Sequence, residues 1–102
     1  MEWVDAAALE ELPDGRPVER WLGDHLVLLL RTGRAVAATQ GHCPHKFTSL
    51  ADGAVADGRL TCPLHAACFD LATGEPLPGQ EWAGRLQVHP VRVEAGRVLV
   101  GL

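Results

Sequence analysis

The sequence lacks a long hydrophobic run. Its longest unbroken apolar stretch, Leu26 to Leu30, has the length of a strand and falls far short of the roughly 18 residues that cross a bilayer. Residues 1–5 are acidic and lack the basic and then apolar pattern of a secretory signal. An excess of positive charge is also missing, since the formal net charge is −4. A chain of this charge repels phosphate backbones and anionic lipid, so we expect neither nucleic acid nor a membrane as a partner.

Cysteine is scarce and odd in number. Three cysteines in 102 residues fit poorly with a disulfide-stapled secreted domain and suit a reducing compartment, so we expect a cytoplasmic protein. Internal repeats, linker-like stretches and low-complexity tracts are absent as well. We therefore expect one domain over residues 1–102, a length that buries roughly two-thirds of the unfolded surface and forms a core without staples.

Short, valine-rich segments separated by turn residues make up most of what is present. Asp52-Gly53 and Asp57-Gly58 are strong turn signals, and alternation of apolar and polar residues near the end of the chain is typical of a half-buried strand. The pattern predicts one short helical turn over 6–11, capped by Asp5, and strands over 17–22, 25–30, 34–39, 54–56, 59–61, 69–71, 86–93 and 98–102. Many short strands of this kind favour an all-β fold, an antiparallel sandwich or barrel.

Two short clusters hold four of the eight cysteine and histidine residues. They are Cys43-Pro44-His45 and Cys62-Pro63-Leu64-His65, with 16 residues (46–61) between them. Two thiolates and two imidazoles suit zinc or an iron–sulfur cluster. Zinc fingers usually keep a cysteine pair in one knuckle and a histidine pair in the other, whereas each cluster here is mixed. A mixed pair can give both thiolates to one iron and both imidazoles to the other.

These two clusters resemble the signature of the Rieske 2Fe–2S family. Residues 49–53, 69–74 and 88–93 are similar to that family's flanks and ending, so the resemblance covers nearly the whole chain. It implies a Rieske-like fold in which two loops form a small cluster-binding subdomain, about 41–74, on a base of residues 1–40 and 75–102. It also implies one 2Fe–2S cluster per chain, held by Cys43, His45, Cys62 and His65.

The likeness is strongest to the stand-alone ferredoxins of ring-hydroxylating oxygenase systems. It implies an electron carrier that is not itself an enzyme, with a flavin-dependent reductase as donor and a terminal oxygenase as acceptor. The sequence offers no further 2-His-1-carboxylate set for a mononuclear iron. Two alternatives remain: the small subunit of an NAD(P)H-dependent nitrite reductase, and a zinc-stabilised structural or interaction module.

Other candidate residues have plainer interpretations. We expect Cys68 to be a small buried side chain, His42 to lie in a surface loop, and the three tryptophans to serve packing rather than electron relay. The loop with Pro76 and Pro78 is a candidate cover for the cluster. The sequence departs from many relatives at Phe47 and at Ala66, where they carry glycine, and Ala66 would be strained if its φ were positive.

Overall fold

The computed structural model of the chain describes residues 1–44, 48–63 and 66–102, and in that part of the chain it is all-β and antiparallel, as predicted. A three-stranded sheet has the order β1 (Trp3–Ala8), β10 (Arg97–Gly101), β9 (Val91–Glu94). A four-stranded sheet has the order β2 (Val18–Leu22), β3 (His25–Thr32), β4 (Ala35–Gln40), β8 (Val88–His89). A small sheet has the order β5 (Ala54–Ala56), β6 (Arg59–Thr61), β7 (Cys68–Asp70). Two 3-10 turns, η1 (Leu9–Glu11) and η2 (Glu81–Ala83), complete the described elements.

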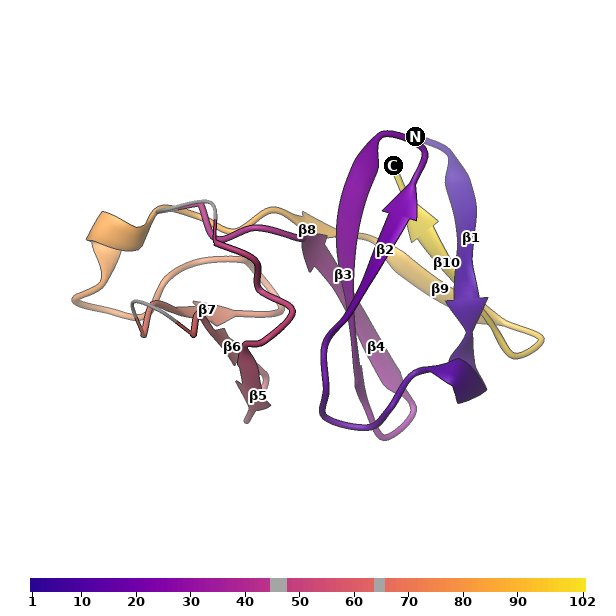
Figure 1. The fold of residues 1–102 in the computed structure, drawn as a ribbon, viewed down its shortest axis with the longest axis horizontal. Coiled ribbons are helices and arrows are strands. Elements are labelled where there is room, and N and C mark those ends of the chain that lie inside the picture. The colour runs from indigo at the N-terminus through magenta and orange to yellow at the C-terminus, as the bar shows by residue number, and fades with distance from the viewer. Residues whose placement is uncertain (45–47, 64–65) are drawn as a thin grey trace.

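The small sheet lies at one end of an elongated molecule. The principal extents are 40 × 27 × 20 Å, and in Figure 1 the two larger sheets occupy one half of the long axis while β5, β6, β7 and η2 occupy the other. The chain enters this end after β4 and returns from it before β8. The division into a base of 1–40 and 75–102 and a subdomain of 41–74 stays a prediction. None of the described helices is long and apolar enough to span a membrane.

Strand β3 explains the unbroken apolar run of the sequence. Leu28 and Leu30 belong to the buried cluster that reaches the small sheet, whereas Val27 and Leu29 belong to the buried cluster between the two larger sheets. Successive side chains of a strand point to opposite faces, so a strand covered on both faces needs apolar residues at every position. β3 is therefore the element that joins the two cores.

The helical turn predicted over 6–11 is wrong. Residues up to Ala8 form β1, which pairs with β10 through a register shift between Asp5 and Ala7, and only 9–11 form a 3-10 turn. Asp5 caps no helix, because its carboxylate binds Arg97 on the neighbouring strand. A run of alanines favours a helix locally, but pairing with β10 satisfies the backbone and buries Ala7.

Two-residue turns set the register of the hairpins. Asp57 and Gly58 both have positive φ (53° and 73°), as a type I′ turn requires, and they join β5 to β6 with the bounds that the sequence predicted. The predicted strand over 86–93 is instead divided at Pro90 into β8 and β9, which lie in different sheets. Proline lacks the N–H that a continuous ladder needs, so the break falls at this residue.

Candidate metal centre

The first hairpin of the candidate site follows β4. The Cys43 amide donates to the carbonyl oxygen of Thr48 at 2.7 Å, and the next pair outward, His42 and Ser49, forms an antiparallel bridge. The Leu50 amide then donates to the Gly41 carbonyl at 2.9 Å. These bonds close a tight loop that begins at Cys43, whose side chain is fully buried. His45, predicted as a ligand in this loop, lies outside the described residues, as do Lys46 and Phe47.

The second hairpin repeats this arrangement between β6 and β7. The Cys62 amide donates to the carbonyl oxygen of Ala67 at 2.7 Å, and the next pair outward is Thr61 and Cys68. In both hairpins the bond joins a cysteine to the fifth residue after it, and a proline follows the cysteine. The two loops therefore present their thiols from equivalent positions. His65 and Leu64 lie outside the described residues.

Both cysteines belong to one buried cluster. Cys43 is 0% exposed and Cys62 is 1% exposed, and the same cluster contains Leu50, Leu60 and Phe69. A thiolate in apolar surroundings is costly unless a cation neutralises it, and a coordinating metal does so while keeping the thiol deprotonated. Two buried cysteine sulfurs in one cluster, presented by matching loops, are donors suited to iron–sulfur or zinc. The described residues therefore fit the thiolate half of the predicted site.

A third segment, which we name the covering loop (residues 75–84), packs against both hairpins. Pro76 bridges Phe69 of β7, and the Leu77 amide donates to the Cys68 carbonyl at 3.0 Å. Ala83 is buried in the cluster that contains Cys43 and Cys62, and a Cβ built on Gly84 would lie 3.7 Å from Cβ of Pro44. Within this loop Pro76 is half-buried and Pro78 is exposed.

The remaining sequence candidates are placed as follows. Cys68 is half-buried rather than fully buried, and the Thr61 hydroxyl donates to its sulfur at 3.4 Å. His42 is exposed, as a surface loop residue would be. Trp21 is 68% exposed and Trp82 of η2 is 51% exposed, so neither is a buried core residue. Ala66 has a φ of +54°, so the strain expected at this position is present.

Sequence reasoning missed two glutamines that bind the ends of the hairpins. Gln40 donates from Nε2 to the His42 carbonyl at 2.7 Å and accepts from the Gln87 amide at 2.8 Å. Gln80 of the covering loop contacts the second hairpin in the same two-ended way. A glutamine carries no local signal of its partner, so only the tertiary contact reveals these roles. No group of three or more His, Cys, Asp or Glu side chains able to hold a metal occurs within 1–44, 48–63 and 66–102.

Comparison with known proteins identifies the class. The family model of the Rieske [2Fe-2S] domain matches residues 2–88. The chain is 36% identical over 102 residues to the ferredoxin component of the alkene monooxygenase system of Xanthobacter autotrophicus, covering 99% of this chain and 82% of that protein. It belongs to the Rieske family, and it has one 2Fe–2S cluster as its cofactor. Within that family it is a ferredoxin, an electron carrier and not an enzyme.

Solved structures agree with this assignment. The ferredoxin of carbazole 1,9a-dioxygenase from Nocardioides aromaticivorans superposes with a TM-score of 0.88 at 28% identity, covering 99% of this chain and 98% of that one. A complex of reduced oxygenase and oxidized ferredoxin in carbazole 1,9a-dioxygenase gives 0.85 at 27% identity, covering 97% and 92%. A candidate small subunit of an NADH-dependent nitrite reductase from Mycobacterium tuberculosis gives 0.86 at 28% identity, covering 97% and 93%.

Proposed function

We propose that this ferredoxin carries single electrons from a flavin-dependent reductase to a terminal oxygenase. The observation that carries the proposal is the pair of matching hairpins that bury Cys43 and Cys62 in one cluster, in a chain of the Rieske family. The names of its relatives support the acceptor, since they are ferredoxin components of oxygenase systems, and one such ferredoxin is known in complex with its oxygenase.

We propose Cys43 and Cys62 as the ligands of one iron and His45 and His65 as the ligands of the other. When bound, the cluster takes up and releases one electron. Two thiolates and two neutral imidazoles leave the oxidised site neutral overall, which favours a higher reduction potential than four thiolates would give; Rieske sites span about −150 to +300 mV against about −400 mV for plant-type sites. Ala67 and Phe69 are fully buried beside the cysteines and bring no hydroxyl donor, so we expect a value near the low end.

The docking face follows from the same geometry. We propose that it centres on His45 and His65, with Lys46, Leu64 and Pro78 around them. We propose that Trp82 extends this face, because η2 lies at the small-sheet end of the molecule (Figure 1) and Trp82 itself is 51% exposed. Tryptophan is among the residues that most often dominate the binding energy of an interface.

Two further parts of the proposal concern organisation and location. We propose that residues 41–74 act as the cluster-binding subdomain on a base of 1–40 and 75–102, which is supported by the small separate sheet β5–β6–β7. We also propose that the protein works in the cytoplasm, which is supported by its odd cysteine count and fits the proposal that two of the thiols bind the cluster. Cell fractionation followed by immunoblotting tests the location.

Metal and sulfide analysis tests the ligand assignment. Purified protein should contain two irons and two acid-labile sulfides per chain and be red-brown. Cys43→Ser or Cys62→Ser should abolish both, because a neutral hydroxyl does not replace a thiolate, while Cys68→Ser is the matched control and should keep the visible and EPR spectra. A colourless protein with one zinc would contradict the iron–sulfur assignment, and loss of colour in Cys68→Ser would contradict the ligand set.

A nitrite reductase small subunit is the second candidate function. The observation in its favour is the structural likeness to the Mycobacterium tuberculosis protein at the same level of identity as to a dioxygenase ferredoxin. Mixing the reduced protein with a terminal oxygenase and, separately, with a nitrite reductase large subunit distinguishes the two. Fast oxidation by the oxygenase alone supports the first function, and fast exchange with the reductase subunit alone supports the second.

A further inference from the structure

We infer that Gln80 is a positioning residue that holds the second ligand hairpin in the conformation needed by the cluster; the inference rests on the proposed ligands Cys62 and His65. The side-chain amide of Gln80 contacts the hairpin at two points. Its Oε1 accepts from the Cys68 amide at 2.8 Å, and its Nε2 donates to the Ala66 carbonyl at 3.3 Å. The two contacted residues lie on either side of Ala67, whose carbonyl accepts the bond from Cys62.

The Gln80 amide takes the place of a backbone peptide group beside β7. Residues 75–77 already pair with β7: the Asp70 amide donates to the Glu75 carbonyl at 2.9 Å, and the Leu77 amide donates to the Cys68 carbonyl at 3.0 Å. The Leu77 carbonyl, which is the backbone acceptor that would pair with the Cys68 amide, instead accepts from the Gln80 amide at 2.9 Å, so the backbone ladder stops there. The amide of Cys68 is the next donor in line, and the side chain of Gln80 satisfies it. An N–H in this half-buried position would otherwise be costly.

The second contact acts on a strained residue. Ala66 has a φ of +54°, a left-handed conformation that the Cβ of an L-residue disfavours relative to the right-handed one. Ala66 directly follows His65 in the sequence, so its backbone conformation sets the direction in which the chain leaves the predicted ligand. A hydrogen bond from Gln80 to the Ala66 carbonyl favours the strained conformation over its relaxed alternatives. Such strain persists only where surrounding contacts enforce it.

The backbone of Gln80 is fixed by hydrogen bonds of its own. Its amide donates to the Leu77 carbonyl at 2.9 Å, closing a turn in which Gly79 has a φ of +89°, as the third position of a type II turn requires. Oε1 of Glu81 accepts from the Gly79 amide at 3.2 Å. The pKa of Glu81 is lowered first by the hydrogen bond from its own backbone amide and then by the one from Gly79. The Ala83 amide donates to the Gln80 carbonyl at 2.9 Å. The side chain therefore starts from a fixed backbone, which reduces the entropy lost in binding the hairpin.

The test compares holoprotein variants of two glutamines. Gln80→Met keeps the length of the side chain and removes both hydrogen bonds, and Gln80→Glu keeps an acceptor for Cys68 but sets a carboxylate against the Ala66 carbonyl. Gln87→Met is the matched control, since the exposed Gln87 side chain makes no hydrogen bond with the described residues. The measurements are iron release to a chelator, the EPR g-values of the reduced protein and the reduction potential by film voltammetry.

Gln80→Met should release iron about fivefold to thirtyfold faster than wild type, the factor that corresponds to losing one or two kcal/mol. Its g-values and potential should differ from those of wild type, Gln80→Glu should be intermediate in iron release, and Gln87→Met should match wild type. If Gln80→Met does not assemble a cluster, Gln80→Glu must show the shifted g-values and potential for the inference to stand.

Wild-type g-values and potential in the Gln80 variants would overturn the inference, even if the melting temperature fell, because a purely structural role would leave the cluster unchanged. Failure of the proposed function is separable from this result. It would show in wild-type protein without iron and sulfide, or in a Cys62→Ser variant that keeps its cluster, and neither outcome depends on Gln80.

Discussion

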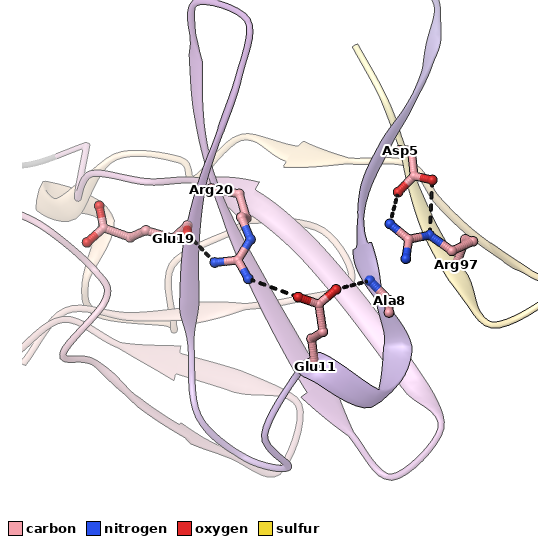
Figure 2. A network of polar contacts seen from close by, with 6 residues as sticks. All are labelled: Asp5, Ala8, Glu11, Glu19, Arg20 and Arg97. Atoms are coloured by element: carbon pink, nitrogen blue, oxygen red, sulfur yellow. Dashed lines mark hydrogen bonds and ion pairs between the residues drawn. The ribbon is translucent and has the colours of Figure 1, made fainter.

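Asp5 of β1 and Arg97 of β10 form a two-point ion pair between these neighbouring strands, at the end of the molecule away from η2 (Figures 1 and 2). Arg97 Nη2 lies 2.7 Å from Asp5 Oδ1, and Nε donates to Oδ2 at 3.0 Å. The hydrogen bond with Arg97 lowers the pKa of Asp5, and the same bond raises the pKa of Arg97. Because both groups are exposed, we expect the pair to add little to the free energy of unfolding and to act mainly by favouring the observed pairing of β1 with β10.

A charge swap tests this pair. Arg97→Glu should lower the melting temperature by setting two carboxylates opposite each other, and Asp5→Arg should do so by pairing two cations. The double variant should recover most of the loss, because the attraction is restored in reverse. Thermal melts of the four proteins at low ionic strength measure the coupling, and all four should keep the wild-type EPR spectrum. Equal losses that add in the double variant would show that the two side chains do not interact.

Ala66→Gly should stabilise the protein. Glycine adopts a φ of +54° without the Cβ penalty, and the gain is roughly 0.5–1 kcal/mol after the larger entropy of unfolded glycine is subtracted. Apparent melting temperatures at a fixed scan rate should rise by a few degrees, about what this free energy gives for a domain of this size. Ala95→Gly is the control, since Ala95 has a φ of +50° in the turn between β9 and β10. It should raise the melting temperature similarly, but only Ala66→Gly should also slow iron release.

His89 gives a prediction on acidity. Burial lowers the pKa of His89 below its usual 6.5, and the positive charge of nearby His25 lowers it further. As the pH falls below 6.5 the unfolded chain binds this proton before the folded chain does. His89 therefore lowers the free energy of unfolding at acidic pH. The loss develops as the pH falls from 6.5 to the pKa of His89 in the folded protein. An NMR titration should give His89 a midpoint below 6.5, and His25→Gln should move it part of the way back. A wild-type midpoint at or above 6.5 would contradict the burial of the ring.

Trp82 is the described residue most directly testable for docking. Trp82→Ala should slow electron transfer to the terminal oxygenase about fivefold or more, since truncating an interface tryptophan commonly costs at least 1 kcal/mol. The spectrum and the potential should stay as in wild type. Trp21→Ala is the matched control, because Trp21 is even more exposed but lies on β2, in the other half of the molecule (Figure 1). Stopped-flow oxidation measures both rates, and a slower Trp21→Ala with a normal Trp82→Ala would place the partner on the base.

Local sequence signals predicted the parts of this protein that depend on near neighbours. The Asp57-Gly58 turn determined β5 and β6 with correct bounds, because a two-residue turn with two positive φ values fixes the register of its own hairpin. The two Cys-Pro clusters indicated the family and its cofactor, since ligand type and spacing are properties of a few consecutive residues. The run Leu26–Leu30 predicted a strand, and the structure places it in β3.

Contacts between distant segments were decided only by the tertiary structure. The sequence of residues 6–8 favours a helix locally. Pairing with β10, about ninety positions later in the chain, outweighs this weak helix propensity and makes these residues part of a strand. Gln80 and Ala66 are 14 residues apart, and nothing in either neighbourhood shows that a side-chain amide will meet a strained carbonyl there. The exposure of Trp21 and Trp82 likewise depends on which elements cover them. Sequence determined which residues can bind the cluster, because donor chemistry is local, whereas packing decided what holds those residues in place, because burial and long-range hydrogen bonds exist only after the chain has folded.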